Sequence, residues 1–158
     1  MASNEIKDTN TTADQMPDIS KWVKVWYADT KTGERTQIAF VEKIPKLEEA
    51  PDAVTGSALD LDYEFSTPGI KKASNIELDI YFTQTQHKIL RNLMNKNLFL
   101  FFQNPAHTAP AGSQPLVRTI QGQMFTTMGE VSVGEYLKET ITIYKNSDVE
   151  ESDGFPTA

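Results

Sequence analysis

The chain contains no cysteine and only two histidines among its 158 residues. The missing thiols exclude disulfide bonds, thiolate nucleophiles and thiolate metal ligands, and they are compatible with folding in a bacterial cytoplasm. His107 lies in a proline-rich loop with no carboxylate at metal-ligand spacing, and His87 lies beside an apolar stripe, where we expect a packing or surface residue. Two separated histidines without cysteine do not predict a zinc site, so we expect neither a metal nor another cofactor.

Long hydrophobic runs are also missing. The longest run, residues 98–102 (LFLFF), has the length of a strand, whereas a membrane-spanning helix needs roughly 18 or more apolar residues. Residues 1–18 are polar and contain no apolar stretch of the kind found in secretory signals. We therefore expect a chain that does not bind a membrane.

The motifs of common enzyme classes are absent as well. Gly112 and Ser113 lack the flanks of a nucleophile elbow, and no P-loop or dinucleotide-binding glycine pattern occurs. Asp60 and Asp62 lie two residues apart on one face of a predicted strand, roughly 7 Å between Cα atoms, and a glycosidase can use such a separation. A row of carboxylates also keeps a strand soluble, or forms a like-charged functional surface. We predict that the chain is not an enzyme.

The charge balance is acidic, with 22 acidic against 15 basic residues and a formal net charge of −7. A surface of this sign repels phosphate, so tight binding to nucleic acid is not expected. Transient contact with nucleic acid, in a setting where adhesion is harmful, remains compatible with this charge.

The length fits one domain that buries a core without disulfides. We expect this β-domain to span residues 19–145, with a long loop at residues 44–57 that contains prolines and acidic residues. Residues 1–18 and the acidic residues 146–158 have few large apolar side chains. Their composition predicts N- and C-terminal arms that do not fold alone and that become ordered against a partner.

The first strand signal covers residues 21–27 (KWVKVWY), and a turn-forming segment separates it from residues 36–41. This pattern predicts a hairpin, but it leaves open which face of the first strand is buried. Trp22 and Trp26 share a strand face with Lys24, an arrangement also found in base-stacking platforms. Because the surroundings are acidic, we expect this aromatic face to be core or a subunit interface.

The clearest pattern alternates apolar and polar residues over residues 59–66 and again over residues 76–83. A period of two places the two kinds of side chain on opposite faces of a strand. A turn at residues 67–69 and the basic pair Lys71 and Lys72 stand between the two segments. The sequence therefore predicts a two-stranded unit with one apolar and one acidic face. The acidic face consists of Asp60, Asp62, Glu64, Glu77 and Asp79.

One helix is predicted at about residues 84–95. Thr83 and Gln86 have capping-box spacing, and the segment carries a single apolar stripe. The stripe consists of Ile89, Leu90, Leu93 and Met94.

Further strands are predicted at residues 98–103, 116–127 and 137–145. The whole order then contains about seven or eight antiparallel strands with one helix near the middle. This order favours a mainly β fold, a β-sandwich or barrel-like domain with one flanking helix, over an alternating βα fold.

The succession of elements over residues 54–148 resembles that of the major tail tube proteins of siphophages. The resemblance is carried by VTGSALDLDYEFSTPGIKKASNIELDIYFTQTQHKILRNL, the aromatic strand NLFLFF and the glycine-marked strands QGQMFTTMGEVSVGEYLKETITIYKNSD. In that family a strand pair leads into one helix, and the last strands end in a Thr/Ile-rich segment and a Ser-Asp exit, here Ser147 and Asp148. The resemblance covers roughly residues 20–148 and rests on no single diagnostic motif.

The resemblance implies a β-sandwich whose copies close into rings of six, and rings that stack into a hollow tube through which DNA leaves the virion. It also implies tail partners, namely the tape measure, tail terminator and distal tail proteins, and assembly in the cytoplasm of a bacterial host. In that setting the acidic face is expected to line the lumen and to repel DNA phosphates. Lys71 and Lys72 are expected to meet acidic residues of the next ring. The other expected inter-ring residues are Glu48, Glu49, Asp148, Glu150 and Glu151.

Two other interpretations remain open at this point. One is a monomeric β-sandwich binding module, for example for carbohydrate or peptide, whose arms are dispensable. The other is the tube subunit of a contractile tail or a secretion-type system, which shares the ring and the fold but has an exterior that faces a sheath.

Overall fold

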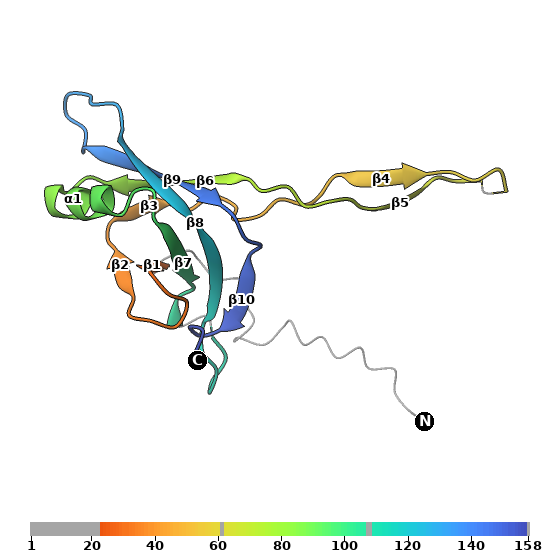
Figure 1. The fold of residues 1–158 in the computed structure, drawn as a ribbon, viewed down its shortest axis with the longest axis horizontal. Helices are drawn as coiled ribbons and strands as arrows, with labels where there is room; N and C mark the ends of the chain where they lie inside the picture. Colours follow the sequence, from red (N-terminus) through yellow and green to blue (C-terminus); the bar gives the residue numbers. More distant parts are fainter. Residues whose placement is uncertain (1–22, 61, 107–108, 158) are drawn as a thin grey trace.

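The structure is a computed structural model that describes residues 23–60, 62–106 and 109–157. The predicted N-terminal arm, Trp22, Leu61 and His107 lie outside these residues. The described chain is mainly β (Figure 1). In chain order its elements are β1 (Lys24–Ala28), β2 (Thr36–Ile38), β3 (Val41–Lys43), β4 (Ala53–Gly56), β5 (Phe65–Pro68), β6 (Asn75–Tyr81), α1 (Gln84–Asn92), β7 (Asn97–Gln103), β8 (Leu116–Met128), β9 (Lys138–Lys145) and β10 (Glu150–Asp153).

Eight strands form one antiparallel sheet, in the order β2-β1-β7-β8-β9-β6-β3, with β10 paired to β8 beside this path. Strands β4 and β5 form a separate two-stranded sheet. The predicted mainly β, barrel-like fold of about seven or eight antiparallel strands with one helix is confirmed.

The two edges of the main sheet are formed by neighbouring stretches of chain. Only Ala39 and Phe40 separate β2, at one edge, from β3, at the other. Phe40 has a φ of 60°, in the left-handed region that residues other than glycine rarely adopt. One bent segment therefore supplies both edge strands, so the sheet curls around its core.

The side chain of Gln86 in α1 binds the backbone at this bend. The Ala39 N–H donates to Gln86 Oε1 at 2.9 Å, and Gln86 Nε2 donates to the Ala39 carbonyl at 3.1 Å. The predicted capping box is wrong, because Thr83 makes no side-chain cap hydrogen bond. The Gln86 amide instead satisfies the backbone N–H and C=O of Ala39, which have left the strand ladder at a partly buried position.

Helix α1 ends at Asn92, somewhat before the predicted end. Leu90 is fully buried and Leu93 packs against the core, whereas Ile89 is 45% exposed. Asn95 has a φ of 66°, a conformation that asparagine tolerates better than most residues. The chain therefore turns there and enters β7.

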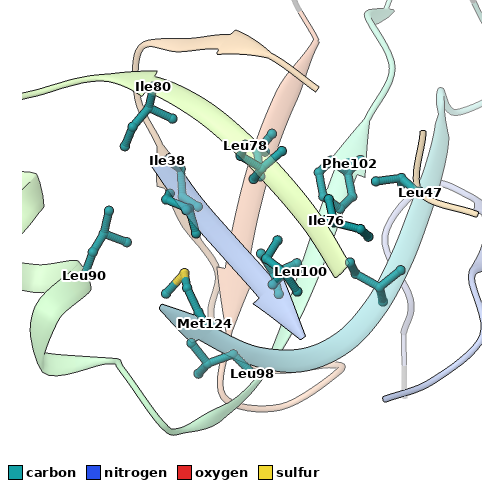
Figure 2. Packing of buried hydrophobic residues seen from close by; sticks show 14 residues of the cluster. Ile38, Leu47, Ile76, Leu78, Ile80, Leu90, Leu98, Leu100, Phe102 and Met124 are labelled. Atoms are coloured by element: carbon teal, nitrogen blue, oxygen red, sulfur yellow. The ribbon is translucent and has the colours of Figure 1, made fainter. Parts of the chain in front are cut away.

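The core fills the concave side of the sheet and is closed by α1 and by Leu47 from the long loop (Figure 2). Alternation along β6 is as predicted, with Ile76, Leu78 and Ile80 fully buried and Glu77 exposed. The core cluster consists of Val25, Ile38, Leu47, Ile76, Leu78, Ile80, Leu90, Leu98, Leu100, Phe102, Ile120, Met124, Ile141 and Ile143.

The predicted pairing of residues 59–66 with residues 76–83 is wrong. Strand β5 pairs with β4, and β6 lies between β9 and β3. The inward side of β6 meets Ile141 and Ile143 of β9, a matching apolar row. No such row is left for Leu59 and Tyr63, which are exposed. Their alternation therefore does not reflect burial within one subunit.

The acidic C-terminal segment, expected to fold only against a partner, pairs within the chain. Strand β10 runs antiparallel to the first residues of β8, and β9 pairs with the rest of β8. Phe155 then packs edge-on against Trp26 and Phe101, with ring centroids 5.8 and 5.9 Å apart. Backbone pairing and one aromatic ring hold this segment in place. Because neither depends on many apolar residues, the composition of the segment does not indicate that it folds within the chain.

The structure of β1 shows which face of the first strand is buried against the core. Val25 faces the core and is fully buried, whereas Trp26 lies on the other side under Phe155. The indole N–H of Trp26 donates to Gln103 Oε1 at 3.2 Å. Trp26 is thus a partly buried packing residue of this side of the sheet.

The Gln86 contact predicts a measurable loss of stability. We expect Gln86→Ala to lower the free energy of unfolding by about 1–3 kcal/mol, because the Ala39 peptide loses both partners. Urea unfolding measures this, with Gln84→Ala, an exposed position on the same helix, as the control expected to stay within about 0.5 kcal/mol of the parent. Equal stability of the two variants would contradict the role of Gln86.

Candidate functional site: the projecting hairpin and the charged surfaces

The most conspicuous candidate surface is a hairpin that extends away from the body of the molecule (Figure 1). We call β4, β5 and the residues that join them the projecting hairpin. Its register pairs Ala53 with Pro68 and Gly56 with Phe65, and neither strand pairs with the main sheet. A two-stranded hairpin alone is at best marginally stable in water. The projecting hairpin therefore lacks the stabilisation that neighbouring strands give one another in the main sheet.

Apolar side chains on the projecting hairpin are exposed. Val54 and Tyr63 are 60% and 72% exposed, and Leu59 is fully exposed. The ring of Phe65 covers Gly56 across the two strands, where an added Cβ atom would lie only 2.8 Å from the ring. Clustered exposed apolar groups on a soluble chain mark contact surfaces. The projecting hairpin is therefore the first candidate for contact with another chain.

The five carboxylates predicted on one acidic face lie on two separate elements. Asp60, Asp62 and Glu64 belong to the far part of the projecting hairpin and form no ion pair within the described residues. Glu77 and Asp79 lie on the solvent side of β6 in the main sheet. The structure does not join the two groups into one surface.

Around Glu77 and Asp79, the outer face of the main sheet is polar and mostly uncharged. Glu77 stands opposite Thr142, and Asp79 stands opposite Thr140, whose hydroxyl donates to Asp79 Oδ1 at 3.2 Å. We define the outer face by the side chains that the register places on the same side of β6, β9 and β8, namely Asn75, Glu77, Asp79, Tyr81, Gln121, Gln123, Phe125, Thr127, Lys138, Thr140, Thr142 and Tyr144. The basic residue among them, Lys138, forms an ion pair with Glu42 at 3.1 Å, and Lys43 of β3 stands opposite Asp79.

The base of the projecting hairpin carries most of the other predicted residues. Lys71 lies 3.1 Å from Asp148 and 3.9 Å from Glu48, and Lys72 lies 2.7 Å from Asp52. Glu48, Glu49, Lys71, Lys72 and Asp148 line one cleft of about 290 Å³. The expected contact of Lys71 with the acidic C-terminal segment is thus present within a single chain. Contact with a second ring stays a prediction.

The remaining predicted inter-ring residues lie on β10. Glu150 forms an ion pair with Lys31 of the same chain, and Glu151 is exposed. Both side chains belong to a strand that pairs with β8. The negative charge of this segment is therefore partly neutralised within the subunit.

Hydrogen bonding perturbs both members of the Lys71–Asp148 pair. The hydrogen bond from Lys71 lowers the pKa of Asp148 below its ordinary value of 3.8. The same hydrogen bond raises the pKa of Lys71 above its ordinary value of 10.5. Both groups are exposed, so solvent screens the contact and its contribution to stability is small.

His87 joins α1 to β9. Its Nδ1 lies 2.6 Å from Oε1 of the fully buried Glu139, and its ring packs 5.1 Å from that of Phe82. The expectation of a packing residue fits this position. We assign the pair to the attachment of the helix to the sheet.

In the part of the chain that the structure describes, no group of three or more histidine and carboxylate side chains could hold a metal ion. None of the helices found there has the length and apolar character needed to cross a membrane.

The pair at the hairpin base predicts a specific titration. The ionised carboxylate of Asp148 contributes its full stabilisation at pH values above its ordinary pKa of 3.8. This stabilisation is lost as the pH falls through the lower pKa that Asp148 has in the folded chain. We expect Lys71→Met to move the pKa of Asp148 back up, as measured by NMR titration of its carboxyl carbon. Lys72→Met, which removes the neighbouring pair with Asp52, is the control that should leave Asp148 unchanged. An unchanged Asp148 titration in Lys71→Met would refute the contact.

No family model matches the sequence, and no curated protein sequence matches it significantly. Solved structures match its fold. A chain from the cryo-EM structure of the anti-feeding prophage tube-terminating cap has a TM-score of 0.65 at 15% identity, covering 94% of this chain and 99% of that chain. A chain from the sheath-tube complex of the PVC extracellular contractile injection system, in its extended state, has a TM-score of 0.62 at 15% identity, covering 91% and 99%. A chain from the anti-feeding prophage baseplate, symmetrised six-fold, has a TM-score of 0.59 at 12% identity, covering 87% and 96%. The chain therefore shares its fold, over nearly its whole length, with components of contractile injection systems.

Proposed function

We propose that the chain is a structural, non-catalytic subunit that polymerises with copies of itself into the tube of a phage-tail-like particle. The projecting hairpin is the observation that carries this proposal. It exposes Val54 on β4, and Leu59 and Tyr63 in the segment between β4 and β5, and neither strand pairs with the main sheet. A second copy supplies the missing cover, and a contact between two different patches of the same chain repeats to form rings or open-ended assemblies.

In the proposed tube, six copies form a ring and the rings stack around a hollow conduit. The matching baseplate is described as symmetrised six-fold, which supports this number. The outer face of the main sheet suits the wall of an aqueous conduit, because it carries hydroxyl, amide and carboxylate groups and its lysine, Lys138, is paired with Glu42. We assign Glu77 and Asp79 to the conduit. Asp60, Asp62 and Glu64 lie on the projecting hairpin, and we assign them to contacts between subunits.

Two kinds of tail fit this proposal. The sequence resembles siphophage tube proteins, in which DNA passes through the tube and the tape measure, tail terminator and distal tail proteins are partners. The second candidate is the tube subunit of a contractile system, and the matching fold in a sheath-tube complex favours it. In either case the protein is a component of the virion or particle, assembled in the bacterial cytoplasm.

Assembly is tested by electron microscopy and sedimentation of the purified chain. We expect hollow filaments or six-fold rings from the parent chain. Gly69 N–H donates to the Asp52 carbonyl at 2.8 Å, so a short Gly-Ser turn can replace residues 53–68 without disturbing the barrel. This variant should remain folded, with a cooperative thermal transition, but sediment as a monomer. A parent chain that stays monomeric at high concentration would support a binding module instead, and polymers of the shortened variant would exclude the hairpin as the joint.

The charge of the conduit is tested by reversing it. In assembled tubes we expect Glu77→Lys with Asp79→Lys to retain double-stranded DNA at low salt and to release it as salt rises, because the wall then binds phosphates. Asp29→Lys with Glu34→Lys makes the same charge change at exposed positions in the β1–β2 turn and is the matched control. Co-sedimentation of DNA with the tubes is the measurement. Equal retention by both variants would remove Glu77 and Asp79 from the conduit.

A further inference from the structure

An aromatic pocket lies at the end of the barrel where β6 leads into α1. We define the aromatic pocket by Phe40, Tyr81, Phe82, Thr83 and Tyr136, which enclose about 340 Å³. Phe40 is 63% exposed and Tyr136 is 83% exposed. Large aromatic side chains left open to water in one concave place are typical of contact surfaces.

The walls of the aromatic pocket are held by the fold. The left-handed φ of Phe40 directs the bend between β2 and β3, and the Tyr81 N–H donates to the Phe40 carbonyl at 3.0 Å. The rings of Tyr81 and Tyr136 meet edge-on at 5.8 Å. The pocket therefore exists before any partner arrives, which lowers the cost of ordering a contact there.

The projecting hairpin and the aromatic pocket lie at opposite ends of the molecule. Figure 1 shows the hairpin at one end of the long axis and α1, which follows the pocket residue Thr83, at the other. The hairpin carries apolar groups, Leu59 and Tyr63, that stay exposed among the described residues. The hairpin of one copy can therefore reach the pocket of another copy by a shift along the long axis.

The charges at the two ends are complementary. Between Ala53 and Pro68 every charged residue is acidic, namely Asp60, Asp62 and Glu64. In α1 every charged residue is basic, namely Lys88 and Arg91, and neither forms an ion pair within the described chain. Lys138, near the Tyr81 ring, is already held by Glu42 at 3.1 Å, and Glu135 beside Tyr136 is acidic. The positive charge available to the hairpin carboxylates at this end therefore comes from α1 and not from the loop that carries Tyr136.

We propose that the projecting hairpin of one copy docks into the aromatic pocket of the next copy. Leu59 and Tyr63 pack against Phe40 and Tyr136, and the hairpin carboxylates face the basic side chains of α1. The contact joins two different patches of the same chain, so it adds copies in one direction without closing on itself as a pair. The proposal rests on the self-assembly proposed above and names the two surfaces that form the joint.

Cysteine cross-linking tests the contact directly, because the chain has no cysteine of its own. Leu59→Cys and Tyr136→Cys are made as two separate variants, mixed in equal amounts under assembly conditions and oxidised mildly. We expect a disulfide-linked dimer that combines one chain of each variant, at least about tenfold more abundant than the dimers of either variant alone. Leu59→Cys mixed with Tyr144→Cys, an exposed aromatic on the side of β9 away from the core, is the matched control and should give only background cross-linking.

A second variant distinguishes this contact from assembly in general. Tyr136→Ser should raise the concentration needed for polymerisation at least about tenfold, and Tyr144→Ser should not. Tubes that form normally from Tyr136→Ser, together with no Leu59–Tyr136 cross-link, would overturn this inference and leave the tube proposal standing. A specific cross-link without hollow filaments would support the contact and overturn the tube. If neither cross-links nor polymers form, both proposals are rejected. A partner of other chemistry is then the candidate occupant of the pocket.

Discussion

The bend at Ala39 and Phe40 is the constraint on which the arrangement of the molecule depends. It lets one short segment pair with β1 at one edge and with β6 at the other. Gln86 satisfies the peptide of Ala39 where no strand can reach it, so the bend leaves no unpaired group at that residue. The same hydrogen bonds fix α1 over the end of the core, where Leu90 is buried. The curl of the sheet, the position of α1 and the aromatic pocket all follow from this corner.

The molecule divides its apolar residues between two environments. Those on the concave side of the main sheet are fully covered and account for the fold, whereas those of the projecting hairpin are covered by nothing in the described chain. The ion pairs of Lys71 and Lys72 lie at the boundary, where the hairpin leaves the body. Because such exposed pairs are individually weak, they orient the hairpin more than they stabilise the barrel. The part of the chain that carries the core and the part that exposes apolar groups are therefore distinct in space.

The elements that sequence reasoning predicts well are those whose own pattern reflects burial. Residues 76–83 alternate because Ile76, Leu78 and Ile80 face the core, and the run of residues 98–103 becomes the buried strand β7. Alternation carries no information about the partner strand, so the hairpin of residues 59–66 with residues 76–83 could not be tested from sequence. Glu77 and Asp79 are on the solvent side, as predicted. The aromatic pocket had one sequence signal, a tyrosine on the polar side of β6 followed by Phe82 and Thr83, but Phe40 and Tyr136 come from distant parts of the chain.

The hydrogen bond between Gly69 and Asp52 brings the two ends of the projecting hairpin together. The hairpin is therefore an insertion that can change in length without moving any core residue. Each residue added to both strands extends its reach by roughly 3.3 Å. The length of the hairpin therefore sets the distance between the main sheet and the surface that the hairpin contacts. This distance can change in evolution without a change in the main sheet.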